Sequence, residues 1–321
     1  MIDFSVVIPT YNGEKRLPEV LEKIQQQTNT ENISWEVIVV DNNSNDRTSQ
    51  IVKNYQTNWN YQFPLKYCFE AKQGLTFARQ RGVKEANSNL IGFLDDDNLP
   101  DQNWVKAAHS FGIKYPQAGA YSGKILGKFE IEPPKEIEKI SRCLAIGEHG
   151  SQPHKFDPDN LKLPPGAGLV IRKQAWSESI PTQLMLIGRV GKVAVAGEDY
   201  EALLHLHKLG WEIWYNPEMQ IQHKVPGSRL EKAYLIPLAR SCGLPICYLR
   251  TINAKNWQKP LIVLRTLFGN LRRVIKHWLK YRSQLDSDLV AAFELEFFWG
   301  SMMSPFYYLK KIYLKKIREA N

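Results

Sequence analysis

Three consecutive aspartates, Asp95, Asp96 and Asp97, follow an apolar segment at residues 90–94 that has the composition of a buried strand. Carboxylates at the end of a buried strand are costly to desolvate unless they bind a cation or another polar group. Asp95 and Asp97 are two residues apart, so on an extended chain their side chains point the same way. Two oxygen donors on one side suit Mg²⁺ or Mn²⁺, and such a divalent cation can hold a diphosphate. A solvated acidic turn is the simpler interpretation of an isolated Asp-x-Asp pair.

The segments around the aspartates alternate between strand and helix patterns. Short apolar runs predict strands at residues 4–8, 36–40, 65–69 and 90–94. Amphipathic spacing and polar turn residues predict helices at about residues 16–27, from the turn at 41–46 to about 55, and from about 75 onwards. Such alternation with short loops predicts an α/β fold with a doubly wound, mostly parallel sheet flanked by helices. Ligands bind these sheets at the carboxyl ends of the strands, which is where the aspartates lie.

Two more side chains have types that suit a nucleotide at this edge. Asp41 ends the strand at 36–40, where its carboxylate could accept the imino N–H of a uracil or guanine base; a helix N-cap is the other interpretation. Arg79 could neutralise phosphate, and a solvated helix charge is its other interpretation. No Gly-x-Gly-x-x-Gly follows the first strand and no P-loop motif occurs, which disfavours dinucleotide dehydrogenases and P-loop enzymes.

Five blocks of sequence, taken in order, resemble glycosyltransferase family two, whose members have the GT-A fold. The blocks are SVVIPTYN (5–12), EVIVVD (36–41), ARQRG (78–82), FLDDD (93–97) and GEDYEAL (197–203). Residues 209–218 and His223 follow in the family's order, so the resemblance spans roughly residues 3–225. It implies an inverting transfer of a sugar from a nucleotide-diphosphate donor, expected to be a UDP-sugar, to an acceptor hydroxyl.

The resemblance also implies donor and metal residues. Those of the donor site are Pro9, Thr10, Tyr11, Asp41, Arg79, Asp95 and Asp96. Of these, the first four would line the base pocket, Arg79 would lie near the diphosphate, and Asp95 would contact ribose or a metal-bound water. Asp97 would ligate the divalent cation, although Asn98 stands where the family commonly has another acidic residue, so the ligand could be Asp96. His223 would approach the metal or the diphosphate, and a hydrogen-bonded strand histidine is its other interpretation.

Asp199 is the residue that the resemblance implies as the general base for the acceptor hydroxyl. A favourable charge at a helix N-terminus is the other interpretation of Asp199 and its neighbour Glu198, and Glu198 is expected to be structural or an acceptor contact. Gly166 and Gly168 would border the donor sugar and the acceptor, and residues 128–163 would form an acceptor-side flap or a mobile loop. No Gln-x-x-Arg-Trp motif of processive synthases occurs, which favours single additions.

The charge of the chain is concentrated in its last third. Residues 224–321 contain 18 Lys and Arg against 6 Asp and Glu, a balance of +12, whereas residues 1–223 contain 24 and 27, a balance of −3. We therefore expect a GT-A domain at 1–225, with a nucleotide-binding half at 1–100 and an acceptor half at 101–225, and a helical, basic region at 226–321. Basic helices with aromatic anchors suit an anionic membrane surface, and a helical cap packed on the sheet is the other interpretation. The layout of this region has some similarity to that of cyanobacterial hormogonium-polysaccharide transferases.

The remaining composition bears on location and partners. The chain has four cysteines without a Cys-x-x-Cys pair, no N-terminal signal peptide and no apolar run of about 18 residues. These features predict a cytoplasmic protein, peripheral at the inner face of the cell membrane. The acceptor would be a saccharide or a lipid-linked molecule. Nucleic acid is not expected as a partner, because no nucleic-acid-binding module accompanies the charge. A catalytically silent scaffold that binds sugar nucleotides or membranes is the rival function.

Overall fold

A parallel four-stranded sheet forms the first half of the computed structural model, which describes residues 1–188 and 195–320. Its strands are β1 (Phe4–Thr10), β2 (Trp35–Asp41), β3 (Leu65–Phe69) and β4 (Leu90–Phe93), in the spatial order β3-β2-β1-β4. The intervening helices are α1 (Leu17–Gln25), α2 (Thr48–Thr57) and α3 (Leu75–Glu85). The strands and helices predicted from the sequence are therefore present, within a few residues of their expected ends.

Alternating side chains of the central strands build two separate cores. Phe4, Val6 and Ile8 of β1 pack with α1 and with α4 (Trp104–Lys114) on one face of the sheet. Val7 points to the other face, where it meets α3, α5 (Lys173–Ser179) and α6 (Glu198–Lys208). Both faces are apolar because helices cover both, which explains why β1 and β2 are buried at every position.

The second half of the sheet is mixed rather than parallel. It continues from β4 through β8 (Val170–Arg172), β6 (Ala118–Phe129), β9 (Glu212–Val225) and β5 (Asn98–Pro100), with β7 (His154–Lys155) also paired to β9. Only β6 and β9 are parallel there. Residues 128–163 carry the short helices η1 (Lys135–Leu144) and η2 (Pro158–Asn160) as well as β7.

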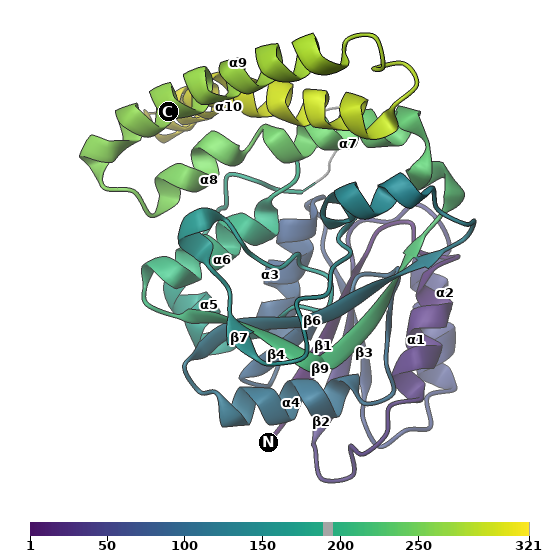
Figure 1. Cartoon of the computed structure of the whole chain (residues 1–321). Coiled ribbons are helices and arrows are strands. Elements are labelled where there is room, and N and C mark those ends of the chain that lie inside the picture. The colour runs from purple at the N-terminus through teal and green to yellow at the C-terminus, as the bar shows by residue number, and fades with distance from the viewer. Residues whose placement is uncertain (189–194, 321) are drawn as a thin grey trace.

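Four helices after β9 form a layer above the sheet (Figure 1). Following η3 (Gly227–Leu230), they are α7 (Lys232–Gly243), α8 (Ile246–Ile252), α9 (Lys259–Tyr281), which is preceded by η4 (Asn256–Gln258), and α10 (Leu289–Ala320). α7 and α8 lie nearest the α/β part, and α9 and α10 lie outermost (Figure 1). α7 and α10 touch through glycines, since a Cβ at Gly243 would meet the Phe297 carbonyl and one at Gly300 would meet that of Arg240. Among the residues that the structure describes, no helix combines the length and apolar character needed to span a membrane.

Candidate active site

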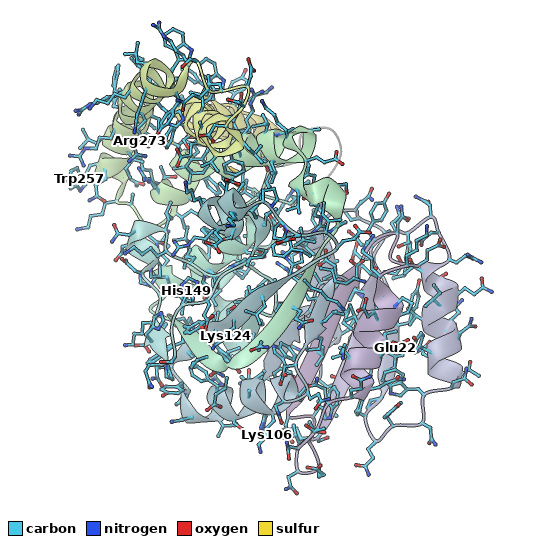
Figure 2. All side chains as sticks on the ribbon, turned by 45° about the vertical axis from the view of Figure 1, so that its right-hand side comes forward. Glu22, Lys106, Lys124, His149, Trp257 and Arg273 are labelled. Atoms are coloured by element: carbon cyan, nitrogen blue, oxygen red, sulfur yellow. The ribbon has the colours of Figure 1, made fainter. Side chains whose placement is uncertain are left out.

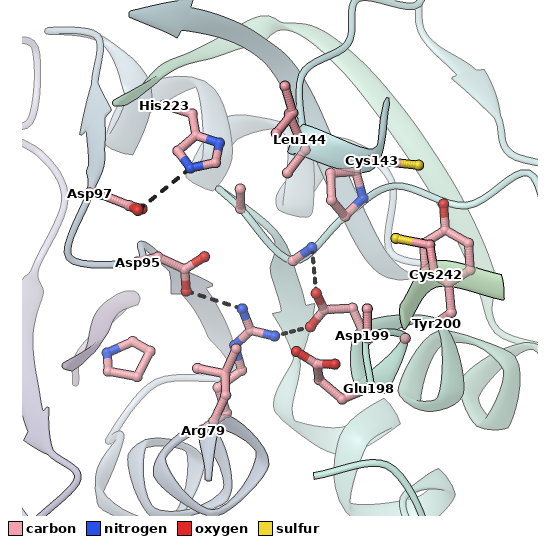
Figure 3. Close-up of a pocket in the computed structure, with 18 of the residues that line it drawn as sticks. Arg79, Asp95, Asp97, Cys143, Leu144, Glu198, Asp199, Tyr200, His223 and Cys242 are labelled. Carbon is pink, nitrogen blue, oxygen red and sulfur yellow. Dashed lines mark hydrogen bonds and ion pairs between the residues drawn. The ribbon is translucent and has the colours of Figure 1, made fainter. Parts of the chain in front are cut away.

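A cavity of about 880 Å³ opens at the carboxyl ends of β1 and β4, beneath the helical layer. Eleven of the site residues predicted from the sequence line it: Pro9, Thr10, Tyr11, Arg79, Asp95, Asp96, Asp97, Gly166, Glu198, Asp199 and His223. Asp41 and Gly168 do not line it. Parts of the chain that are far apart in sequence thus supply one site (Figure 3).

Asp97 faces His223 across the junction of two strands. β5 and β9 pair with Asn98 opposite His223, and Asp97 accepts a backbone bond from Lys224 at 2.9 Å. The pairing brings His223 Nε2 to 3.5 Å from Asp97 Oδ2 (Figure 3). Burial opposes ionisation of Asp97, but the contact with His223 and the charge of Arg229 outweigh it, so the pKa of Asp97 lies below its ordinary value.

Arg229, at the start of the helical layer, contacts both members of this pair. Its Nη1 lies 3.0 Å from His223 Nε2, and its Nη2 donates to Asp97 Oδ2 at 3.1 Å. His223 Nε2 can accept this bond when the ring is neutral, and His223 Nδ1 is a buried atom without a partner among the described residues. The position between Asp97 and His223 is therefore one that attracts positive charge.

Asp96 is held inside the protein framework rather than turned to a ligand. Arg16 binds it through two bonds, Nε to Oδ1 at 2.8 Å and Nη2 to Oδ2 at 2.9 Å, and Thr10 donates to Oδ2 at 2.7 Å. The added Cβ of any larger residue at Gly13 would overlap Thr10, so the turn after β1 depends on a glycine there. Of the two aspartates that the sequence left open as metal ligand, Asp97 is thus the one beside a second ligand-type side chain.

Asn98 stabilises the turn that carries the aspartates. Its side-chain oxygen accepts from the Asp95 backbone N–H at 3.1 Å, and its Nδ2 donates to Asp97 Oδ1 at 3.1 Å. An aspartate at this fully buried position could not donate the second bond. The departure from the family pattern therefore has a structural role.

Arg79 joins Asp95 to Asp199. It projects from α3, donates to Asp95 Oδ1 at 3.2 Å and forms an ion pair with Asp199 Oδ1 (Figure 3). Asp199 Oδ2 accepts the Gly166 N–H at 2.9 Å, so both oxygens of Asp199 are oriented. Burial raises the pKa of Asp95, Arg79 offsets this only in part, and Asp97 and Asp96 raise it further. Arg79 thus lies between Asp95, which follows β4, and Asp199, the residue predicted to be the base.

Asp41 lies beside the cavity but faces the protein. Its two oxygens accept from the Ser44 N–H and from the Tyr67 hydroxyl, each at 2.9 Å. Burial, with the charge of Asp41, raises the pKa of Tyr67 to about 12. The neighbouring Asn42 does line the cavity and accepts the Gly74 N–H at 2.7 Å. The predicted contact of Asp41 with a base stays a prediction.

The two glycines predicted on the acceptor side differ in role. Gly166 lies so close to Asp199 that an added Cβ would overlap its carboxylate. Gly168 has φ +66°, a left-handed conformation that favours glycine, and it packs on Ile221 outside the cavity. Only Gly166 therefore touches the site directly.

Glu201 is a buried carboxylate that our sequence analysis missed. It accepts backbone bonds from Met185 at 2.8 Å and Leu186 at 2.7 Å, and a bond from the Tyr248 hydroxyl at 2.5 Å. Burial raises its pKa, and these three bonds offset that only in part. Glu201 thereby ties α6, which begins with Glu198 and Asp199, to α8 of the helical layer.

Arg16, Arg142 and Arg229 also line the cavity and were missed as site residues. Each lies in a segment whose local pattern predicts only a surface charge. Arg229 had one signal, since it follows the Pro-Gly pair after β9 within six residues of His223. Nothing in the local sequence connects Arg16 to Asp96.

The chemistry of the donors fits a divalent cation at Asp97 and His223. A carboxylate oxygen and an imidazole nitrogen converge there, Nε2 of the neutral ring is an acceptor, and a guanidinium already binds both atoms. The described residues contain no group of three or more His, Cys, Asp or Glu arranged to hold a metal. Ligand positions beyond these two would have to come from phosphate oxygens and water, as is common for Mg²⁺.

Comparison with known proteins begins with the N-terminal part of the chain. Residues 5–125 match the model of Glycosyl transferase family 2. Glycosyltransferase AglE of Haloferax volcanii is 32% identical over 103 residues, which are 32% of this chain and 33% of AglE. The poly(ribitol-phosphate) beta-N-acetylglucosaminyltransferase TarS of Staphylococcus aureus is 32% identical over 111 residues, 35% of this chain and 19% of TarS. The matches thus span a third or less of these relatives' own lengths.

Solved structures extend the likeness to the whole chain. The crystal structure of S. aureus TarS 1–349 in complex with UDP-GlcNAc superposes with a TM-score of 0.52 at 15% identity, covering 96% of this chain and 92% of that one. GalNAc-T7, solved with UDP, GalNAc and Mn²⁺, gives a TM-score of 0.55 at 15% identity over 76% of this chain and 48% of that one. At these identities the likeness shows the fold alone, and it confirms the predicted α/β GT-A architecture.

Proposed function

The chain belongs to glycosyl transferase family 2 through its domain at residues 5–125, and from this premise we propose that it transfers a sugar from a nucleoside-diphosphate donor, a UDP-sugar, to an acceptor hydroxyl. The observation that carries the proposal is the bridge that Arg79 makes between Asp95 and Asp199 in one cavity. It sets a proton acceptor beside the aspartates that follow β4. A relative named for transfer of N-acetylglucosamine, and its structure solved with UDP-GlcNAc, support the donor class.

In this proposal Pro9, Thr10, Tyr11 and Asn42 bound the nucleoside, with Asp41 behind them. Asp95 contacts the ribose side of the donor. Arg79 faces the diphosphate, where a guanidinium can neutralise the charge that accumulates as UDP leaves. A divalent cation held by Asp97 and His223 would supply Lewis-acid stabilisation of the same leaving group. Titration with Mn²⁺ of wild type and Asp97→Asn tests this assignment.

Asp199 is the general base. It takes the proton of the acceptor hydroxyl, the acceptor oxygen forms a bond to the anomeric carbon, and the bond from that carbon to the diphosphate oxygen breaks on the opposite side. One such displacement inverts the anomeric configuration. The Gly166 N–H and Arg79 use one lone pair each on the two carboxylate oxygens, which leaves others for the hydroxyl. The absence of a processive-synthase motif supports a single addition per encounter.

Calorimetric titration of UDP, GDP and dTDP, each with and without Mn²⁺, tests the donor class. We expect one nucleotide, UDP, to bind, and its binding to weaken in Asp97→Asn. Donor turnover in Asp199→Asn should fall by about 10² to 10⁴, while UDP binding persists. Full turnover in Asp199→Asn would remove the base assignment. A protein that binds UDP but never turns over a donor would be the scaffold instead, and binding of no nucleotide would end the transferase proposal.

We further propose that residues 1–225 act as the transferase domain and that residues 226–321 hold it on the inner face of an anionic membrane. α9 supports this because it exposes large apolar side chains, whereas the residues it buries fully are polar. The residues it buries are Thr266, Asn270 and His277. Those it exposes are Leu261, Leu264, Phe268, Leu271, Ile275, Trp278 and Leu279. A stripe of large apolar side chains thus faces away from the protein.

The charges beside this stripe select the partner. α9 contains Lys259, Arg265, Arg272, Arg273, Lys276 and Lys280, and no acidic residue. Two copies of the chain that paired through the stripe would bring like charges together, whereas anionic lipid head groups would neutralise them. Figure 2 shows Trp257 and Arg273 projecting from the outer side of the helical layer, away from the sheet. An anionic bilayer therefore fits this face best.

A further inference from the structure

The helix that carries Asp199 begins without a capping side chain. α6 starts at Glu198, and its N-cap residue is Gly197, which has no side chain to bond the N–H groups of the first turn. Gly197 has φ +107°, so it supplies a sharp turn but cannot hold the helix in place. The position of the first turn, and of Asp199 within it, must therefore come from other parts of the fold.

Two hydrogen bonds from the helical layer reach this helix start. The Ser241 hydroxyl of α7 accepts the backbone N–H of Ala196, which precedes the helix, at 3.0 Å. The Tyr248 hydroxyl of α8 donates to Glu201, in the first turn of α6, at 2.5 Å. One bond lies just before Asp199 in the chain and the other just after it, so the two bonds together hold the backbone on both sides of the predicted base.

Glu201 extends this hold to the segment in front of α6. Its side chain is buried, and besides Tyr248 it accepts the N–H groups of Met185 and Leu186. The Thr76 hydroxyl of α3 donates to the Leu186 carbonyl at 3.1 Å. A buried carboxylate is costly unless its oxygens are bonded, and here the donors come from α8 and from a segment that packs on α3. Glu201 therefore joins the helical layer to the elements around the base.

Apolar packing places α8 against the same helix start. An added Cβ at Gly197 would lie 3.3 Å from Pro245 and 3.6 Å from Leu249, so the backbone before α6 is in direct contact with α8. Leu249 is buried in the same core cluster as Leu203 of α6. The two hydrogen bonds thus belong to a packed interface, in which they have a fixed geometry.

We propose that the helical layer is part of the catalytic unit, with Ser241, Tyr248 and Glu201 as positioning residues for Asp199. None of these three residues lines the cavity, so they act on the reaction through the backbone of α6. This inference rests on the proposed function, in which Asp199 is the base. It gives residues 226–321 a second role besides membrane attachment.

Removing single hydroxyl groups tests the proposal. In Tyr248→Phe and in Ser241→Ala, kcat for UDP release should fall by about tenfold, while the Kd for UDP, measured by calorimetry, should stay within about twofold. The donor is whichever of UDP-glucose, UDP-galactose and UDP-N-acetylglucosamine the wild type turns over fastest, with water as the acceptor. Thermal unfolding reports that each variant is folded, and either variant alone tests the proposal.

Tyr121→Phe is the matched control. It also removes a buried hydroxyl group, one that donates to the Ala108 carbonyl at 2.8 Å within the core cluster on the other face of the sheet. We expect it to lower the thermal stability and to leave kcat unchanged. A fall in kcat as large as that in Tyr248→Phe would show that any loss of stability slows the reaction, and would overturn the proposal.

The Asp199→Asn background separates positioning from a merely structural role. In that background Tyr248→Phe and Ser241→Ala should not lower UDP release further, because both act through the Asp199 carboxylate. Hydrogen–deuterium exchange gives a readout that needs no donor: the amides of residues 196–203 should exchange about five- to tenfold faster in both variants and not in Tyr121→Phe. Equal losses of kcat in both backgrounds would overturn the proposal.

The outcomes also distinguish this inference from the proposed function. If Asp199→Asn loses UDP release and the two hydroxyl variants keep the wild-type kcat, Asp199 stands as the base and positioning by the helical layer is wrong. If the wild type binds no UDP, or Asp199→Asn keeps full turnover, the proposed function fails and this inference fails with it.

Discussion

Arg79 and Asp199, which are 120 residues apart in the chain, form an ion pair at the centre of the cavity. Arg79 comes from α3, which precedes β4 and the aspartates that follow it, and Asp199 comes from α6. The Arg79 side chain is only 5% exposed and that of Asp199 is 18% exposed. The pair therefore holds Asp199, the predicted base, against α3 in an environment where solvent screens little.

Replacing Arg79 tests this link. Arg79→Ala leaves the Asp95 and Asp199 carboxylates buried without a cation, so we expect the free energy of unfolding to fall by about 3 kcal/mol and donor turnover by about 10² or more. Denaturant unfolding and UDP release measure the two effects. Arg81→Ala is the matched control, because Arg81 lies on the same helix and pairs with Glu85 at a position that is 37% exposed. Equal losses in both variants would contradict a specific role for Arg79.

Gly166→Ala should move Asp199 without removing it. The added methyl group would overlap the Asp199 carboxylate and displace the oxygen that accepts the Gly166 N–H. We expect kcat to fall by about tenfold to a hundredfold while UDP binds as before, since a small misplacement of a catalytic group is costly. Gly269→Ala, where an added Cβ meets nothing, controls for the substitution itself. An unchanged kcat would mean that Asp199 does not need its present position.

Arg229→Ala should raise the affinity for Mn²⁺. Arg229 binds the Asp97 and His223 atoms that would hold the cation. Its removal takes away a competing positive charge and leaves the negative charge of Asp97 free to attract the cation. We expect the Kd for Mn²⁺, measured by calorimetry in the absence of nucleotide, to drop several-fold. Asp97→Asn should reverse the gain. An increase in Kd in Arg229→Ala would show that Arg229 supports the cation site instead of competing for it.

The buried Glu36 of β2 predicts a pH dependence of stability. Burial opposes its ionisation, but Lys66, Asn87 and Ser5 outweigh that and hold its pKa below the ordinary value of 4.5. Because the folded-state pKa is depressed, the contribution is complete above about pH 4.5 and is lost as the pH falls through the folded-state value. Glu36→Gln should lower the free energy of unfolding at pH 7 by about 1–2 kcal/mol and flatten its acid decline. Glu31→Gln, at an exposed position, should change neither.

The outward stripe of α9 predicts binding to anionic vesicles. Phe268, at 60% exposure, and Leu264, at 50%, can leave water only if another surface covers them. In co-sedimentation with phosphatidylcholine vesicles containing about a third phosphatidylglycerol, the wild type should bind, and the Leu264→Ser/Phe268→Ser variant should bind at least about tenfold more weakly. Raising the salt concentration should weaken binding of the wild type. Equal binding to neutral vesicles would remove the role of the basic residues, and no binding to either kind would contradict membrane docking.

Local sequence determined the framework of the parallel half of the sheet. Apolar runs with turn residues at their ends predicted β1 to β4, and the position of the aspartates after residues 90–94 placed them at the edge of the sheet where ligands bind. Each of these features is determined by a stretch of about ten residues or fewer, because periodicity and strand termination are local properties of the sequence. The same reasoning predicted that the carboxylates after residues 90–94 need a cation or another polar group, and each of the three contacts an arginine.

Tertiary structure decided which partners each charge has. The antiparallel pairing of β5 with β9 brings His223 to Asp97, and η3 then brings Arg229 to both. Arg16, on the other side, occupies Asp96. The contacts of Asp97 with His223 and Arg229, and that of Asp96 with Arg16, have no local signature, because they form only when segments at least 80 residues apart close on each other.

Which side of α9 packs against the protein likewise could not be predicted from the sequence. Its amphipathic pattern predicts a helix with one apolar side, and such a side ordinarily packs inward. In the folded protein the fully buried residues of α9 are Thr266, Asn270 and His277, and His277 donates to the Ala291 carbonyl at 2.8 Å, while the apolar stripe stays exposed. Sequence periodicity determines that a helix has two sides, but only the neighbouring helices, through the hydrogen bonds and close contacts they offer, determine which side is buried.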